Sequence, residues 1–183
     1  MFRWKPFARM LCATGLVAAI ATSAMAQEAQ PTASDDGFWS RITIAAPIFT
    51  RHYPHDSEFN DNNWGGFAFY AFTNQLYFAG GDFINSYKKN TAFIAVAYLP
   101  LNLSFSRINI DAGGMLGVDL NGGYKGYNSL DPALGALIIK FSGNYFDAPG
   151  YRFLNRAGLL LTVIPGVTSG TSTAFNLALT YRL

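Results

Sequence analysis

Two kinds of side chain in this sequence could together activate an oxygen nucleophile. The only histidines are His52 and His55, and Ser86 lies 34 residues after the first of them. An imidazole beside a serine hydroxyl is the minimum arrangement for acyl transfer, and a third group usually orients the imidazole. A positioned general base contributes roughly 10²–10⁴-fold to such a reaction. Surface loops also carry His and Ser without catalysis, so these residues alone leave the chemistry open.

Metal, cofactor and thiol chemistry find little support in the sequence. Asp56, Glu58 and Asp61 are equally consistent with solvated loop charges and with contacts to a divalent cation on a phosphorylated lipid. No group of ligands has the spacing of a zinc site, so no metal and no cofactor is expected. The only cysteine, Cys12, lies close to the N-terminus, and the remaining chain offers neither a disulfide nor a thiolate nucleophile.

The N-terminal segment has the pattern of a secretory signal. Arg3, Lys5 and Arg9 precede an apolar stretch, and Ala24-Met25-Ala26 offers a small-x-small cleavage site. We therefore expect a signal peptide over residues 1–26, a flexible lead-in over 27–39 and the folded domain over 40–183. Three of the 13 basic residues but none of the 11 acidic ones lie in the signal, so the rest carries a formal charge of −1. Without a basic cluster, no nucleic-acid partner is expected.

The composition predicts a membrane protein that spans with strands. Half of the residues are apolar and only 13% are charged, against about 25% in a typical soluble protein. No segment after the signal approaches the roughly 20 apolar residues of a transmembrane helix. In lipid every backbone polar group needs an internal partner, which leaves a closed barrel. We expect an all-β, eight-stranded antiparallel transmembrane β-barrel in the bacterial outer membrane. A soluble periplasmic sandwich or lipocalin-like barrel shares the alternation but not the low charge.

Eight segments have strand character and place the candidate residues at one end. Alternation is clearest in the last segment, where large apolar side chains are expected to face lipid and small ones the lumen; Gly66, Ala68, Ala95 and Ala97 are likewise expected to line the lumen. The long connections 51–63, 85–90, 119–132 and 165–172 are expected outside, and tight turns at 73–74 and 100–102 inside, with 143–156 as a long exception. The segments are 40–50, 64–72, 75–84, 91–99, 104–118, 133–142, 157–164 and 173–183.

Four short motifs follow one another along the chain: PIFTRH at 47–52, NNWGGF at 62–67, NSYK at 85–88 and IPG at 164–166. In their order and approximate spacing they resemble the lipid A palmitoyltransferase (PagP) family, from about residue 43 to the C-terminus. The resemblance implies an outer-membrane barrel with an internal acyl-measuring pocket. It also implies transfer of a palmitoyl chain from a phospholipid to lipid A by outward-facing His, Asp and Ser residues. The implied partners are the two lipids, and a monomer is expected.

The resemblance assigns roles to three candidate catalytic residues. His52 matches the family's essential histidine, Ser86 matches its serine, and Asn85 stands where an aspartate is expected. Asparagine can orient an imidazole by hydrogen bonding but cannot offset its positive charge. The chain could therefore react more slowly, recruit another acid, or be a noncatalytic relative.

The resemblance also assigns roles in lipid binding. Pro47 and Pro165 match two prolines that interrupt strand pairing and admit lipid sideways, although turn or strand-end prolines would look the same. Ala97 matches a glycine at the floor of the acyl pocket. Its extra methyl group predicts a preference for a chain somewhat shorter than palmitate.

Three functions follow from these observations. The leading one is a lipid A acyltransferase of the outer membrane. The alternative is a noncatalytic structural or adhesive barrel, for which Asn85 is the best argument. A lipid A deacylase also pairs Ser with His, but the order of the motifs does not favour it.

Overall fold

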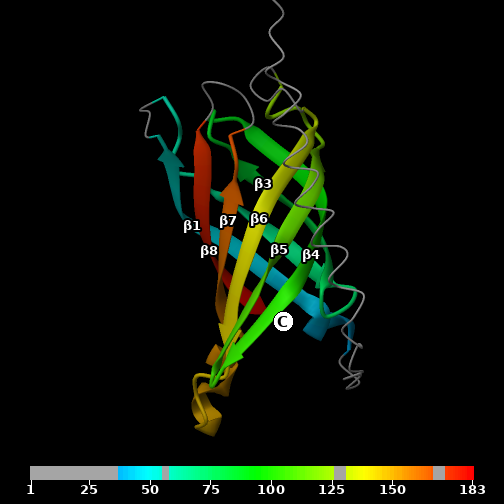
Figure 1. The fold of residues 1–183 in the computed structure, drawn as a ribbon, viewed down its shortest axis with the longest axis vertical. Coiled ribbons are helices and arrows are strands. Elements are labelled where there is room, and N and C mark those ends of the chain that lie inside the picture. Colours follow the sequence, from blue (N-terminus) through cyan, green and yellow to red (C-terminus); the bar gives the residue numbers. More distant parts are fainter. Residues whose placement is uncertain (1–36, 55–57, 126–130, 167–171) are drawn as a thin grey trace, which may run out of the picture. The chain divides into compact units, whose positions relative to one another are not determined.

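The computed structural model describes residues 37–54, 58–125, 131–166 and 172–183. The expected signal peptide, residues 27–36 of the expected lead-in, His55 and Asp56 lie outside these ranges. The described chain forms a closed antiparallel barrel in which eight strands pair in chain order and the last returns to the first (Figure 1), which confirms the predicted fold class. The strands are β1 Ile42–Tyr53, β2 Gly65–Ala71, β3 Leu76–Ile84, β4 Asn90–Phe105, β5 Ile108–Asp119, β6 Ala133–Gly143, β7 Ala157–Ile164 and β8 Thr173–Arg182.

Two short 3₁₀ segments complete the described fold. Phe38–Arg41 (η2) leads into β1, and Pro149–Arg156 (η3) lies between β6 and β7. Figure 1 shows η3 at the end of the barrel where β6 ends and β7 begins. The long connection at 143–156, expected from the sequence as an exception, therefore contains a folded segment. No helix within the described ranges is long and apolar enough to cross a membrane.

Side chains alternate between the two faces of the barrel as the sequence predicts for β8 and β4. In β8 the buried positions are Ala174, Asn176, Ala178 and Thr180, whereas Leu179 is 52% exposed. In β4 Ala95 and Ala97 are buried, whereas Ile94, which alternates with the inward-facing residues, is 54% exposed. Because a closed eight-stranded barrel is only wide enough for side chains, the small inward residues leave space and the large ones face outward.

The predicted orientation of β2 is wrong. Gly66 and Ala68 are exposed, and Ala68 pairs with the outward-facing Ile44 of β1. Phe67 and Phe69 therefore point inward, where Phe69 belongs to the buried core. β2 differs from β8 because its large residues face the lumen, so the rule that large side chains face outward does not hold around the whole ring.

The predicted turn at 100–102 is also wrong. β4 continues through Pro100 to Phe105, and the chain turns at Ser106, which has a positive φ of 53°. The proline falls where the β4–β5 register shifts between Tyr98 and Leu101. Proline lacks a ladder donor, and here it is accommodated by a bulge rather than by the end of a strand. Gly113 faces this bulge, where a Cβ would overlap the Tyr98 carbonyl.

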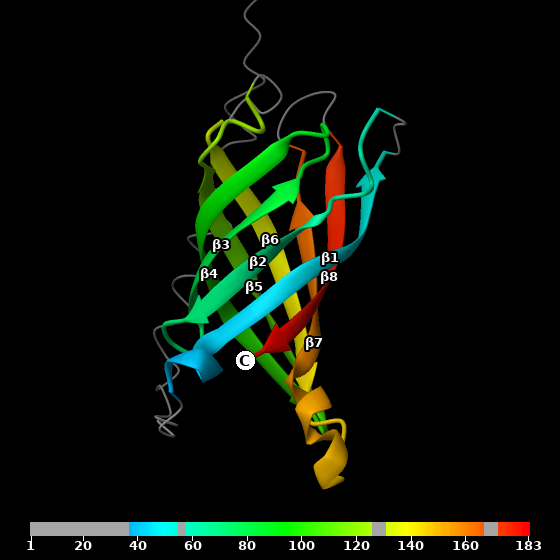
Figure 2. The ribbon, with the colours of Figure 1, turned by 180° about the vertical axis from the view of Figure 1, so that it is seen from behind.

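Two ladders of the barrel stop short at the same end. β1 pairs with β2 only from Ile42 to Ala45, although β1 continues beside β8 to Tyr53 (Figure 2). β6 pairs with β7 only from Leu137 to Phe141, so its first four residues pair with β5 alone. The panel made of β7, β8 and β1 is therefore bordered on each side by a stretch without backbone pairing.

The opposite half of the lumen contains a charged pair. Lys140 of β6 and Asp111 of β5 are cross-strand partners whose Nζ and Oδ2 atoms lie 3.5 Å apart, with little side-chain exposure. Lys140 also lies over the Tyr77 ring, 5.4 Å from its centroid. A charge in this confined space needs its partner, because an unpaired buried charge is costly.

Replacing Lys140 by Met is expected to lower the free energy of unfolding by about 1–3 kcal/mol, because Asp111 then loses its cation. Urea titration of the folded barrel in detergent measures this change. The matched control is Arg107→Gln, which breaks the exposed ion pair between Arg107 and Asp147 and is expected to cost less than about 1 kcal/mol. Equal losses for the two variants would contradict a structural role for the inner pair.

Candidate active site

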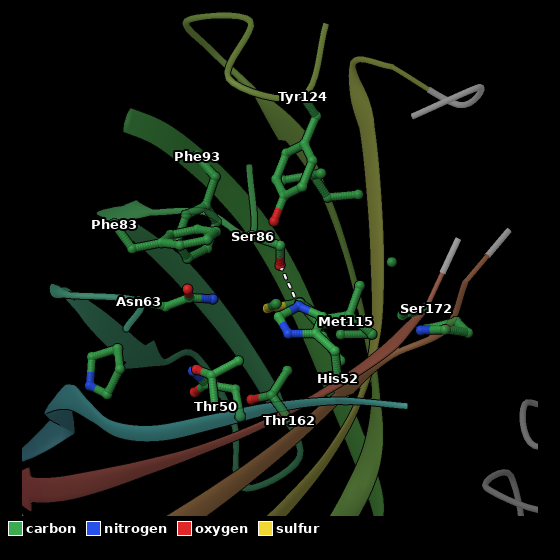
Figure 3. Close-up of a pocket in the computed structure, with 18 of the residues that line it drawn as sticks. Thr50, His52, Asn63, Phe83, Ser86, Phe93, Met115, Tyr124, Thr162 and Ser172 are labelled. Carbon is green, nitrogen blue, oxygen red and sulfur yellow. Dashed lines mark hydrogen bonds between the residues drawn. The ribbon is translucent and has the colours of Figure 1, made fainter. Parts of the chain in front are cut away.

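An apolar cavity of about 190 Å³ occupies the half of the barrel in which the two ladders stop short. Aromatic side chains of β2, β3 and β4 form much of its wall, and Met115 of β5 also lines it (Figure 3). Pro47 and Pro165, the predicted sites of lateral access, both line it. The four aromatic wall residues are Phe67, Phe69, Phe83 and Phe93.

His52 and Ser86, which the sequence nominates together, meet at this cavity. His52 is 3% exposed near the end of β1, and Ser86 lies in the turn between β3 and β4. The His52 Nε2 and Ser86 Oγ atoms are 2.7 Å apart, as Figure 3 shows with a dashed line. This distance is short enough for the hydroxyl to donate its proton to the imidazole.

A carboxylate that the sequence does not single out completes the arrangement. The Asp61 Oδ1 atom lies 2.7 Å from His52 Nδ1, on the opposite side of the ring from Ser86. With the carboxylate accepting a hydrogen bond from Nδ1–H, Nε2 is left as the acceptor for the serine hydroxyl. Ser86, His52 and Asp61 thus have the contacts of a nucleophile, a general base and an orienting acid.

Asp61 lies at the edge of the site, beside a cation and in contact with solvent. Its side chain is 30% exposed, and its Oδ2 atom lies 3.4 Å from Nη1 of Arg51. Since the carboxylate keeps contact with both solvent and a cation, it avoids most of the penalty of burying a charge. It can therefore oppose the positive charge that forms on His52 during proton transfer.

Asn60 fixes the loop that carries Asp61 against the serine turn. Its backbone N–H donates to the Ser86 carbonyl at 2.8 Å, and its side-chain amide donates to the Asn62 and Asn85 carbonyls. Asparagine commonly stabilises turns through such side-chain to backbone bonds. Asp61 and Ser86 are consequently held at a defined separation by residues outside the strands.

Asn85 does not contact His52 but organises the serine turn. Its side chain is completely buried, and its Oδ1 atom accepts hydrogen bonds from the backbone N–H groups of Tyr87 and Lys89. Its Nδ2 group donates to Thr91 Oγ1 and to the Gly123 carbonyl. These contacts need two donors as well as an acceptor, and an ionised aspartate has no donors. Among the described contacts of His52, the orienting one comes from Asp61.

A run of aromatic rings extends from the triad along the neighbouring loops. Phe59 stacks on the His52 ring with centroids 4.9 Å apart. Tyr87 packs edge-on against Phe59, and Tyr124 packs edge-on against Tyr87. These rings reduce the access of water to the imidazole, which strengthens its electrostatic contacts.

Ala97, the predicted floor of an acyl pocket, does not line the large cavity. It lines a smaller one of about 20 Å³, together with Tyr77 and Lys140. Phe69 and Leu160 line both cavities and therefore separate them. These two side chains, rather than Ala97, therefore set the depth of the large cavity.

One level of the cavity wall is polar. Thr50 and Thr162 are the cross-strand partners of Asn176 on either side, and all three side chains are buried. Asn176 Nδ2 donates to Thr50 Oγ1 at 2.8 Å, whereas its Oδ1 atom has no partner among the described residues. Thr50 precedes His52 by two residues on β1 and so lies farther from the end of the strand. The polar surface therefore extends from the triad into the adjoining part of the cavity.

The described residues contain no group of three or more His, Cys, Asp or Glu side chains that could hold a metal ion. No protein-family model matches the chain, and no curated protein sequence matches it.

The triad geometry predicts that Ser86 reacts with an alkyl fluorophosphonate, which mass spectrometry detects as a modified peptide. His52→Ala is expected to abolish labelling, and Asp61→Asn to slow it by up to about 10⁴-fold, because the amide favours the wrong imidazole tautomer. Ser172 also lines the cavity, but the described contact of its hydroxyl is the Pro54 carbonyl. Ser172→Ala is therefore the control and should label normally; labelling that survives in His52→Ala would exclude activation by the imidazole.

Proposed function

We propose that the protein is an outer-membrane acyltransferase that moves a fatty acyl chain from a phospholipid to lipid A. The observation that carries the proposal is the His52 imidazole, bonded to Ser86 on one side and Asp61 on the other at an apolar cavity. A nucleophile, a base and an orienting acid suit acyl chemistry, and the cavity suits a hydrocarbon chain. The motifs that resemble the lipid A palmitoyltransferase family support the same substrates.

The surface of the barrel supports a membrane location. Large apolar side chains are exposed on its strands, among them Ile48, Phe49 and Leu116. In water such a surface would be a site of association or aggregation, whereas in lipid it is the expected exterior of a barrel. A closed ring of paired strands also meets the requirement that backbone polar groups in a bilayer be satisfied internally.

The two unpaired stretches supply separate routes for two lipids. One lies beside Pro47, where the β1–β2 ladder has ended, and the other beside Pro165, where β7 has ended. Proline donates no backbone hydrogen bond, so it does not favour closing these gaps. Since both prolines line the cavity, a donor and an acceptor could approach Ser86 from opposite edges of the β7–β8–β1 panel. Two lipid routes favour transfer between lipids over hydrolysis.

The chemistry follows from the three side chains. Ser86 Oγ attacks the carbonyl carbon of the phospholipid ester while His52 Nε2 takes its proton. The tetrahedral intermediate then breaks the ester C–O bond, and His52 returns the proton to the departing lysophospholipid oxygen. In the second half a lipid A hydroxyl attacks the acyl–Ser86 ester, gives its proton to His52, and releases Ser86, which regains that proton. Asp61 stabilises the imidazolium in both halves.

Selection of the acyl chain depends on shape. Burying a methylene from water is worth about 0.8 kcal/mol, but the donor chain leaves a bilayer that is already apolar, so most of this gain cancels. The depth of the cavity then decides which chains fit with their ester at Ser86. Phe69 and Leu160 set that depth, which is consistent with a chain shorter than palmitate.

Expression in a host that lacks lipid A palmitoylation tests the proposal by the mass of its lipid A. We expect a gain of one acyl chain that His52→Ala and Ser86→Ala each abolish, because they remove the base and the nucleophile. Ser172→Ala should leave the gain intact. Loss of one acyl chain from lipid A would indicate a deacylase instead, and an unchanged mass with folded protein would indicate a noncatalytic barrel.

Replacing Phe69 is expected to shift the preference toward longer chains, because Phe69 separates the two cavities. Competition between phospholipids of different chain length measures the shift. Phe69→Ala can cost about 3–5 kcal/mol of stability, so Phe69→Leu provides a milder variant. Ala97→Gly is the control and should leave the preference unchanged, because Phe69 still closes the large cavity. A longer preferred chain in Ala97→Gly alone would restore Ala97 as the floor.

A further inference from the structure

We propose that the Tyr124 hydroxyl donates a hydrogen bond to the oxyanion formed at Ser86, and that Asn85 holds Tyr124 in position to do so. This inference rests on the proposed acyl transfer and adds a catalytic and a positioning residue to it. Tyr124 lies between β5 and β6, 38 residues beyond Ser86. Both residues line the large cavity, and Figure 3 shows the tyrosine hydroxyl pointing toward Ser86 from the side opposite His52.

The transferred acyl group needs such a donor. When Ser86 Oγ bonds to the ester carbon, the carbonyl π electrons move to oxygen and create a negative charge, which reverts to a carbonyl as the leaving oxygen departs. In many serine enzymes the backbone N–H of the residue after the nucleophile binds this oxygen. Here that group is the Tyr87 N–H, which already donates to Asn85 Oδ1 at 2.8 Å. The charge must therefore be met by a different donor.

The Tyr124 hydroxyl keeps its proton, and no hydrogen bond from it to a described residue is found. The side chain is partly buried where it lines the cavity. This burial, with smaller contributions from Tyr87 and Asp119, raises the pKa of the Tyr124 phenol well above its usual value near 10. The group therefore stays neutral around pH 7 and keeps the proton that it would share with an oxyanion.

The backbone that carries Tyr124 is held by a single carboxylate. Asp119, at the end of β5, accepts hydrogen bonds from the N–H groups of Asn121, Gly122 and Tyr124 at 3.1, 3.0 and 2.8 Å, respectively. Its side chain is buried, so these bonds are sheltered from water. Oxyanion donors contribute most when they are fixed before the reaction, and this loop meets that condition.

Asn85 connects this loop to the nucleophile. Its Nδ2 group donates to the Gly123 carbonyl at 2.8 Å, directly before Tyr124, while its Oδ1 atom orders the turn directly after Ser86. Gly123 permits the approach, because a Cβ there would overlap the Thr91 hydroxyl and the Asn90 carbonyl. One side chain thus sets the separation between Ser86 and the proposed oxyanion donor.

The decisive variant is Tyr124→Phe, studied as the purified barrel in mixed micelles of phospholipid and lipid A. We expect kcat to fall by about 10²–10³-fold with KM unchanged, because the lost bond forms only in the transition state. An alkylboronic acid, which forms a tetrahedral anionic adduct on serine, should bind more weakly by a similar factor. A non-cleavable ether analogue of the phospholipid should bind both proteins equally. The control is Tyr53→Phe, an exposed tyrosine that should retain wild-type values.

The role of Asn85 is tested by Asn85→Asp, alone and together with Tyr124→Phe. The aspartate keeps the acceptors but loses the donors to Gly123 and Thr91. We expect kcat and boronate affinity to fall together, and the double variant to be little worse than Tyr124→Phe, since both changes act on one contact. Fully additive losses would overturn the positioning role.

The two proposals fail in different ways. If Tyr124→Phe keeps the wild-type kcat and boronate affinity, the assignment of Tyr124 is overturned. The acyltransferase proposal still stands in that case, provided that the wild type transfers the acyl chain and Ser86→Ala does not. A similar loss of affinity for the ether analogue and the boronate would show a structural effect on the cavity and would also overturn the assignment. Absence of transfer by the wild type would overturn both proposals.

Discussion

Backbone pairing around a closed ring of eight strands is the constraint on which the site depends. It assigns every strand residue to the inside or the outside, and the inside of such a ring has room only for side chains. The large cavity lies in the half where β1 is no longer paired with β2 and β6 is not yet paired with β7. The same two interruptions that border the cavity are also the proposed lateral routes for lipid, so the space and the proposed access to it have one structural origin.

The polar residues of the site are distributed so that little charge is buried. His52 and Ser86 are buried, whereas Asp61 lies at the edge with solvent and Arg51 beside it. A carboxylate placed beside Phe67 or Phe93 would lose its hydration without a cation in compensation. The acid therefore comes from a loop outside the ring, while the base comes from β1, where alternation turns it inward. This placement lets an apolar cavity and a charge-stabilised imidazole adjoin.

The parts of this structure that were predictable from sequence are those governed by strand periodicity. Alternation identified the inward face of β8. His52 and Ser86 follow the first and third predicted strands, which run in the same direction, so they were expected at one end of the barrel, where they meet. Periodicity alone does not say which face of β2 is inward. It also predicted that β4 ends before Pro100, whereas a bulge accommodates this proline within the strand. Asp61 was one of several loop acids, and it is distinguished by its contact with His52 and by the bonds of the neighbouring Asn60 to the serine turn. Such contacts join different loops and have no repeating pattern in sequence.

The exchange of an expected aspartate for Asn85 separates two tasks. Orienting and charging the imidazole requires only an anion, which Asp61 provides from the loop after β1. Holding the serine turn against the loop after β5 requires a side chain that accepts and donates at once, and Asn85 has both functions fully used. An aspartate at position 85 would place a second negative charge in a completely buried site and leave the Gly123 carbonyl without its donor. Asparagine at this position is therefore a consequence of where the anion lies, and it is no argument that the chemistry has been lost.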